Sequence, residues 1–245
     1  MIGLGTRLLP RRRLPDRIRL EDPAVTVALR VSTRARRFTL RLDPAGDGAV
    51  LTMPPGVALA HVEAFLQEHA GWLAHALARQ PERVRISPGA RVPVDGVDQL
   101  LLSGDHRGAP RLSECGLVLP AGRAPGRAVQ AWLKERARAR MVPAVERYAA
   151  QLGRPVAAVS LRDTRSRWGS CTSAGRISLS WRLAMAPVAV QDYVAAHEVA
   201  HLQEMNHSPR YWRCLAGLMP DYQRHRAWLR REGRHLHAYD FDSAG

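Results

Sequence analysis

The sequence predicts an α+β fold in which a small antiparallel, β-rich region, residues 1–120, precedes a mainly helical domain, residues 121–245. Three observations support this division. Short alternating or continuous apolar segments, typical of strands, dominate the first half. Apolar residues at helical spacing dominate the last third. The segment between them, AGRAPGR, has the small and turn-forming residues of a linker.

The N-terminal region is expected to contain a small antiparallel meander. Residues 25–31 (VTVALRV) and 38–42 (FTLRL) have strand patterns, and the turn-rich DPAGDG leads into a third strand, AVLTM at 49–53. Apolar residues at helical spacing then predict a helix from 58 to 79, which Pro81 ends. Residues 83–120 are expected to form short strands, because Gly and Pro interrupt them.

The C-terminal domain is expected to begin with a long helix from 128 to 152. Gly153 and Pro155 mark its end, and Pro143 is expected to kink or split it. Strands are predicted at 156–161 and at 177–183 (ISLSWRL), where apolar and polar residues alternate strictly. The next helix is expected to begin near Pro187, a residue suited to a first helical turn.

Composition limits the class of protein. The chain of 245 residues, 46% of them apolar, is long enough for one large core or two small ones. It has no apolar run long enough for a membrane span and no signal peptide, so we expect a cytoplasmic protein. Its three dispersed cysteines do not form a disulfide framework. The net charge of +15 leaves nucleic acid as a candidate partner, but Lys134 is the sole lysine, and this skew toward arginine resembles genomic compositional bias.

Residues 197–201 form the motif H-E-x-x-H within the predicted helix. His197 and His201 lie one turn apart on one helix face, so both imidazoles can reach a single zinc ion. Glu198 lies beside them, where it can hold a metal-bound water and accept its proton. Composition alone gives about 0.02 chance occurrences of this pattern. The motif therefore indicates a zinc-dependent hydrolase with Glu198 as general base.

A catalytic zinc site needs a third protein ligand, and His207 is the leading candidate. Its distance in sequence from His201 is that of the longer motif H-E-x-x-H-x-x-G-x-x-H, although Glu204 stands where that motif has glycine. The chain must turn back, and Asn206 is expected to end the helix in a left-handed conformation. Ser208-Pro209 then suits the start of another helix. Glu204 is the rival ligand, and manganese or another metal is an alternative to zinc.

The chain strongly resembles the YgjP-like metallopeptidases, relatives of the SprT-like zinc proteases. The resemblance is most specific in the last third and extends to the β-rich first half. It implies a zincin-like catalytic domain whose zinc ligands are His197, His201 and His207, with Glu198 as base. The segments that carry it are RSRWGSC (165–171), ISLSWRLAMAP (177–187), DYVAAHEVAHLQEMNHSPRYW (192–212) and PDYQRHRAWLRREG (220–233).

The resemblance also implies how a substrate is held. In zincins a sheet edge beside the metal helix pairs with an extended peptide, and residues 177–183 are expected to be that edge strand, with RSRWGSC running beside it. Arg165 or Arg167 is a candidate for stabilising negative charge on the reacting group, as are the hydroxyl groups of Tyr193 and Tyr211. Cys171 is a weaker candidate for a redox or inhibitory metal contact.

These observations together predict a zinc metallopeptidase that acts on peptides or proteins. Two other functions stay open. The first is a zinc-dependent hydrolase of nucleotide phosphoanhydrides, in which Arg165, Arg167 and Arg182 bind phosphate groups. The second is a DNA-associated protease or binding protein, for which steep loss of binding with added salt would be diagnostic.

Overall fold

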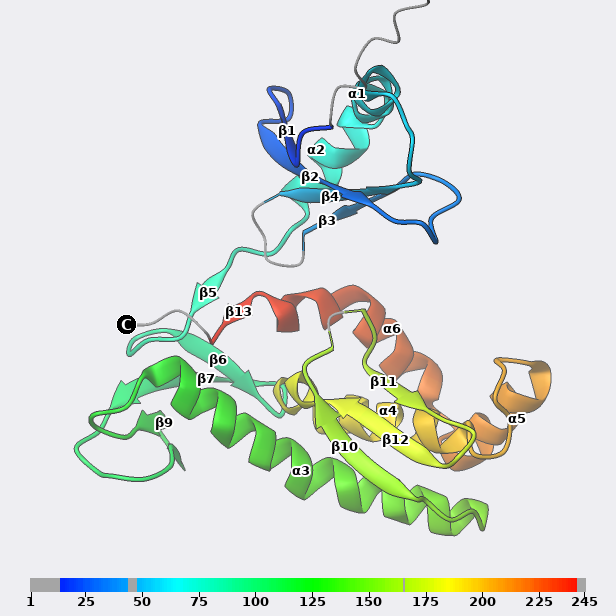
Figure 1. Cartoon of the computed structure of the whole chain (residues 1–245). Coiled ribbons are helices and arrows are strands. Elements are labelled where there is room, and N and C mark those ends of the chain that lie inside the picture. Colours follow the sequence, from blue (N-terminus) through cyan, green and yellow to red (C-terminus); the bar gives the residue numbers. More distant parts are fainter. Residues whose placement is uncertain (1–13, 44–47, 165, 242–245) are drawn as a thin grey trace, which may run out of the picture. The chain divides into compact units, whose positions relative to one another are not determined.

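The computed structural model describes residues 14–43, 48–164 and 166–241, and it is an α+β protein, as predicted (Figure 1). The chain divides into two compact units, Met1–Gln80 and Pro81–Gly245. This division precedes the expected boundary between residues 120 and 121, because strands from 91 to 119 pack into the core of the second unit. None of the helices in the described ranges combines the length and apolarity of a membrane span.

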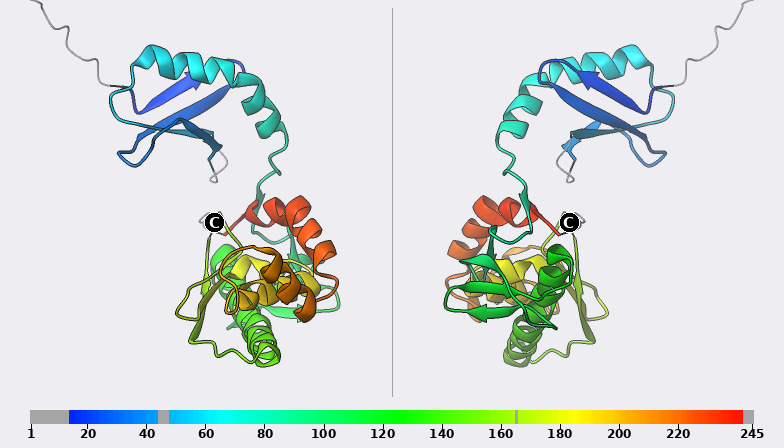
Figure 2. Two further views of the ribbon diagram at one scale, coloured as in Figure 1. Left: turned by 90° about the vertical axis from the view of Figure 1, so that its right-hand side faces the viewer. Right: turned by 90° about the vertical axis from the view of Figure 1, so that its left-hand side faces the viewer.

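The first unit is a four-stranded sheet in the order β1-β2-β4-β3, covered on one face by two helices (Figure 2). β2 and β4 are parallel, so the sheet is mixed and the expected antiparallel meander is wrong in this detail. The single helix expected at 58–79 is broken at His69, which separates α1 from α2. The elements are β1 Arg17–Leu20, β2 Val25–Val31, β3 Thr39–Leu42, β4 Ala49–Met53, α1 Leu59–Glu68 and α2 Ala70–Ala78.

Alternation along the strands of the first unit explains its core. Val25 and Val27 of β2, like Leu51 and Met53 of β4, point to one face of the sheet and are buried. Side chains of α1 and α2, among them Leu66, pack onto the same face. This unit therefore has a hydrophobic core of its own.

The second unit begins with a four-stranded sheet in the order β6-β7-β9-β8 and a short parallel pair that joins β5 to the last strand, β13. The β7–β9 pair is parallel, and its neighbours are antiparallel. The bounds are β5 Val84–Arg85, β6 Arg91–Val94, β7 Val97–Ser103, β8 Arg111–Ser113, β9 Gly116–Leu119 and β13 Tyr239–Asp240.

The long helix α3, Pro125–Leu152, crosses the second unit and packs against α4, Val188–Ala200. It continues through Pro143 without being split. Gly153 ends it with a φ of 64°, the left-handed conformation expected of a glycine in this position. Leu133, Ala137 and other buried side chains of α3 contribute to the core that supports α4.

The sheet beside α4 has the order β10-β12-β11, and its elements are β10 Ala158–Arg162, β11 Gly169–Cys171 and β12 Arg176–Ser180. The segment RSRWGSC does run beside ISLSWRL, because β11 pairs antiparallel with β12. The expectation that residues 177–183 form the edge strand is wrong, since β12 is central and the chain becomes the 3-10 helix η1, Trp181–Met185. The edge that contacts α4 belongs to β11.

Three further elements follow α4 and complete the second unit (Figure 1). They are α5 Pro209–Leu218, α6 Tyr222–Glu232 and the 3-10 helix η2 Gly233–His237. The helices α5 and α6 both pack against α4.

Arg182 in η1 joins separate parts of the second unit through its guanidinium group. Only 6% of the residue is exposed. Its guanidinium donates to the Asp163 carboxylate at 2.8 and 3.3 Å, and to the carbonyl oxygens of Leu236 and Tyr239, both at 3.1 Å. One buried side chain thus connects the end of β10 to the C-terminal segment.

Replacing Arg182 by Met is expected to lower the free energy of unfolding by about 2–3 kcal/mol. The substitution removes the group that donates hydrogen bonds to one carboxylate and to two carbonyl oxygens. Urea unfolding followed by tryptophan fluorescence would measure this. Arg162→Met, at an exposed neighbouring position, is the control with the same change of charge. Equal unfolding midpoints for the two variants would contradict the bridging role of Arg182.

Candidate metal centre

The C-terminal turn of α4 presents His197 and Glu198, and His201 follows at the helix end. The opposite side of α4 is apolar, and its residues Ala196 and Val199 are buried in the core. Burial of this side fixes the rotation of the helix about its axis. The helix therefore turns its two histidines toward the space between β11 and the chain that follows α4.

The chain turns back after His201 and brings His207 to α4. The helix ends in tight turns, in which the amides of Leu202 and Gln203 donate to carbonyls three residues earlier. Asn206 is not in the left-handed conformation expected from the sequence, since Asp95 is the one non-glycine residue with positive φ in the described ranges. Tight helical turns, rather than a left-handed residue, thus end α4.

The start of α5 holds the returning loop in place, as the pair Ser208-Pro209 predicts. Ser208 is the N-cap, and its hydroxyl accepts from the Tyr211 amide at 3.3 Å. The indole nitrogen of Trp212 donates to the carbonyl oxygen of His207 at 3.1 Å, and the His207 ring stacks on the Trp212 ring. Two contacts from α5 thus fix the backbone and the ring of His207.

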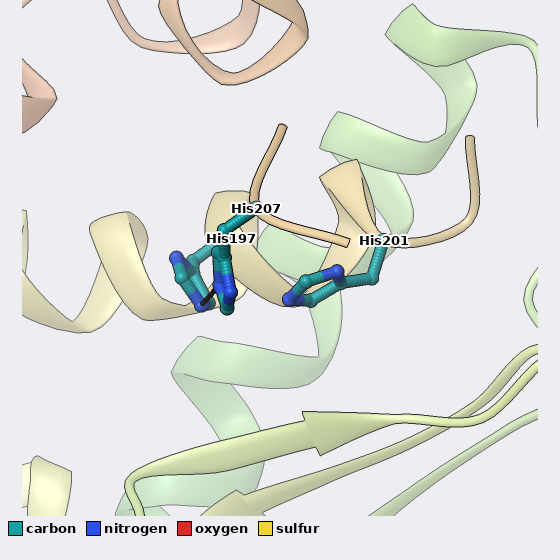
Figure 3. Close-up of side chains that lie close together, drawn as sticks. All are labelled: His197, His201 and His207. Atoms are coloured by element: carbon teal, nitrogen blue, oxygen red, sulfur yellow. Dashed lines mark hydrogen bonds between the residues drawn. The ribbon is translucent and has the colours of Figure 1, made fainter. Parts of the chain in front are cut away.

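The three imidazoles of His197, His201 and His207 converge (Figure 3). One ligand nitrogen from each ring lies within 4.8 Å of the other two. The Nε2 atoms of His197 and His207 are 3.3 Å apart. Two nitrogens bound to one tetrahedral zinc ion at its usual bond lengths are about 3.3 Å apart, so this pair already has the spacing of zinc ligands.

Hydrogen bonds orient two of the rings for metal binding. Nδ1 of His201 lies 3.1 Å from the backbone oxygen of Glu204, and Nδ1 of His197 lies 2.6 Å from the Tyr211 hydroxyl. A proton on each Nδ1 leaves Nε2 as the lone-pair donor. Burial, and secondarily the neighbouring His201, lowers the pKa of His197 to about 3, which keeps this ring neutral as a ligand must be.

Tyr211 contacts the histidine cluster through His197. It is fully buried in α5, and its hydroxyl donates to the His197 carbonyl at 3.0 Å while it contacts Nδ1 of the same residue. Both hydroxyl contacts are therefore to His197, so Tyr211 positions a ring and is not a free donor for the reacting group. Tyr193, the other tyrosine considered, lines the cavity itself.

Glu198 is buried beside the histidines, with 4% of its surface exposed. A Cβ atom at Gly169 of β11 would lie 2.4 Å from its Oε1 and 2.7 Å from its Cδ, so the glycine makes room for the carboxyl group. Burial raises the pKa of Glu198 to about 8, and the positive charge of Arg167 opposes this rise. A divalent cation in the histidine cluster would act in the same direction as Arg167.

The candidate ligands and base open into a cavity of about 590 Å³. Arg167 and Cys171 line it, and burial raises the pKa of the Cys171 thiol to about 11, which disfavours the thiolate that binds metals. Arg165 lies outside the described residues. The rival ligand Glu204 lines a different cavity, together with Arg210 and Arg213. Arg182, proposed from the sequence to bind phosphate, is buried in its pairing with Asp163.

Several residues of this site escaped the sequence analysis. Gly169 lies in a strand against Glu198, a contact between residues far apart in the chain. Arg226 and Arg230 of α6 also line the cavity. Their spacing of one helical turn was the available signal, but nothing in the sequence showed which face of α6 points to the histidines.

Comparison with known proteins identifies a family for this chain. The model of the YgjP-like family, described as a metallopeptidase domain, matches residues 36–232. None of the curated proteins matches the chain. Among solved structures, the crystal structure of the metallopeptidase zymogen of Pyrococcus abyssi abylysin is similar, with a TM-score of 0.35 and 22% identity over 39% of this chain and 94% of that one.

Replacing Tyr211 by Phe is expected to weaken zinc binding by about 10-fold to 100-fold, because the His197 ring loses the partner of its Nδ1. Competition with a chromophoric chelator would measure the affinity. Tyr193→Phe, which removes the hydroxyl of the tyrosine that lines the cavity, is the matched control, because the hydrogen bond to Nδ1 of His197 comes from Tyr211. Unchanged zinc affinity in the Tyr211 variant would show that its hydroxyl does not support the metal site.

Proposed function

This chain belongs to the YgjP-like family, the family of a metallopeptidase domain, and from that premise we propose that it is a zinc-dependent peptidase. Membership of the family implies a divalent metal and a peptide or protein substrate. The finer assignment of zinc, of each ligand and of the base is our proposal. The observation that carries it is the convergence of His197, His201 and His207 beside a buried carboxylate.

The three imidazoles would hold the zinc ion through nitrogen atoms, and they leave its fourth position open, as in catalytic zinc sites. When bound, zinc supplies Lewis-acid polarisation of a carbonyl group and makes water more acidic. Glu198 would accept a proton from the attacking water and then donate it to the nitrogen of the leaving amine. The close contact with Gly169 keeps the carboxyl group in place for both transfers.

The free edge of β11 is the proposed binding site for the substrate backbone. One edge of β11 pairs with β12, and the residues of β11 line the cavity beside Glu198. An extended peptide can add to such an edge as a further strand, through main-chain hydrogen bonds that tolerate many sequences. This proposal replaces residues 177–183, which occupy the centre of the sheet.

Two groups are available to stabilise negative charge on the reacting carbonyl oxygen. Arg167 is close enough to Glu198 for its charge to oppose the rise of the Glu198 pKa, and Tyr193 lines the same cavity. Burial raises the pKa of Tyr193 to about 12, so its hydroxyl stays protonated and can donate a hydrogen bond. We propose no choice between these two donors.

Hydrolysis of nucleotides is the less favoured function. Of the three arginines that the sequence offered for phosphate binding, Arg182 is buried against Asp163, and Arg165 lies outside the described residues. Of the two arginines that the structure describes, Arg167 lines the cavity and Arg182 does not. Family membership also points to peptides rather than nucleotides.

Replacing Glu198 by Gln is expected to leave zinc binding intact and to lower kcat for peptide hydrolysis at least about 100-fold, because the amide cannot accept a proton. Metal analysis and cleavage of an unstructured protein such as casein would check the two halves separately. His207→Ala is the contrasting variant, in which zinc content and turnover should fall together. A zinc-loaded Gln variant with normal turnover would remove Glu198 from its role as base.

Replacing Gly169 by Ala is expected to abolish most peptidase activity while the domain stays folded, because the new methyl group displaces a side chain rather than backbone. The carboxyl group of Glu198 would leave its position, and small displacements of a catalytic group cost large factors in rate. Circular dichroism and cleavage assays would be compared with those of Gly217→Ala, where a Cβ meets no neighbour within 4 Å. Full activity of the Gly169 variant would contradict the assigned position of the base.

A further inference from the structure

Three arginines line the cavity that contains the histidine cluster: Arg167, Arg226 and Arg230. Among the described residues, Glu198 supplies the sole carboxylate in its lining, and this group is buried and assigned to proton transfer. The mechanism above uses at most Arg167. Two cationic side chains of α6 are therefore left in the substrate cavity without a role.

Neither of these two arginines has an acidic partner of its own in the described part of the chain. The ion pairs found there involve other arginines, including Arg224 and Arg231 of the same helix, which pair with Asp221 and Glu232. Arg226 and Arg230 are thus the members of α6 whose charge faces the cavity, whereas their neighbours are neutralised outside it. An arginine kept free beside an active site can bind an anion in two parallel hydrogen bonds.

The two side chains lie one helical turn apart and therefore project from one face of α6. The Arg226 guanidinium lies 4.5 Å from the centre of the Trp212 ring, a cation–π contact that fixes its direction. Trp212 is also the residue that donates to the His207 carbonyl. Trp212 thus contacts both His207 and Arg226. The fold therefore fixes the distance between the histidine cluster and the guanidinium of Arg226.

We propose that Arg226 and Arg230 form a subsite for a carboxylate of the substrate, so that the enzyme prefers peptides with an acidic group close to the scissile bond. This inference rests on the proposed peptidase function and names its substrate class. The edge of β11 would bind the peptide backbone without regard to sequence. Any preference for particular substrate side chains must then come from the other residues that line the cavity. Of these, α6 supplies two with positive charge.

The carboxylate can come from an Asp or Glu side chain or from the C-terminus of the peptide, and paired substrates distinguish these sources. One pair differs only by Glu against Gln at each position flanking the cleaved bond. A second pair differs only by a free against an amidated C-terminus. In each pair the acidic peptide should have a kcat/KM about 10-fold higher if its carboxylate binds the two arginines, and the effect should appear mainly in KM.

Substitutions in α6 test whether its arginines cause the preference for acidic peptides. Arg230→Ala and Arg226→Ala should each reduce the ratio between paired peptides toward 1, and Arg230→Glu should shift preference toward Lys-containing peptides. Arg231→Ala, which removes a charge from the same helix outside the cavity, should keep the ratio of the unmodified protein. Because Arg226 lies on Trp212, zinc content is measured in its variants, and Arg230, free of that contact, gives the independent result.

The outcomes separate this inference from the proposed function. Cleavage of both members of every pair at equal rates keeps the peptidase and overturns the carboxylate subsite. Cleavage of no peptide overturns the peptidase. Anisotropy of labelled acidic and neutral peptides with Glu198→Gln then tests the subsite by binding alone, and equal affinities overturn it as well. Chelator-sensitive phosphate release from nucleotides that Arg230→Ala abolishes would assign the arginines to phosphate and overturn the carboxylate proposal.

Discussion

The return of the chain from the end of α4 to its own histidine face is the constraint on which the candidate centre depends. Two histidines one turn apart on a helix could provide only two nitrogen ligands, and the third candidate comes from the loop before α5. That loop is short and polar, so local preference alone cannot hold it. Two aromatic residues of α5 hold it instead: Tyr211 contacts the His197 ring, and Trp212 contacts the backbone and ring of His207. Packing of α5 against α4 therefore determines whether three imidazoles meet.

The same region shows how a buried carboxylate is accommodated at a reactive position. Burying Glu198 disfavours its charged form, and the fold keeps it there by placing a glycine of β11 against it and Arg167 nearby. In the proposed function β11 would therefore have two roles, since it would confine the base and offer its free edge to an extended peptide. Because β11 pairs with β12 and contacts α4, the geometry of sheet and helix would then link substrate binding to the position of the base.

The arginines of the second unit differ in role according to their surroundings. Arg182 is buried, and its guanidinium joins η1 to Asp163 and to carbonyl oxygens of the C-terminal segment. Its charge therefore contributes to stability. Arg226 and Arg230 carry the same kind of charge into the cavity, where it is available to an anion. The overall charge of +15 does not distinguish these cases, because it depends only on composition. The groups that surround each guanidinium distinguish a structural arginine from one that is free to bind an anion.

Local patterns in the sequence were enough to predict the α+β class, the helix that carries His197 and Glu198, the glycine end of α3 and the Ser208 cap of α5. Each of these follows from short-range periodicity or from hydrogen bonds between near neighbours. It also marked His207 as the third candidate ligand by spacing alone. The folded chain was needed to show the parallel pairing of β2 with β4, the central place of β12, and which face of α6 meets the histidines. Strand order and helix rotation depend on contacts between residues far apart in the chain, and local patterns do not encode those contacts.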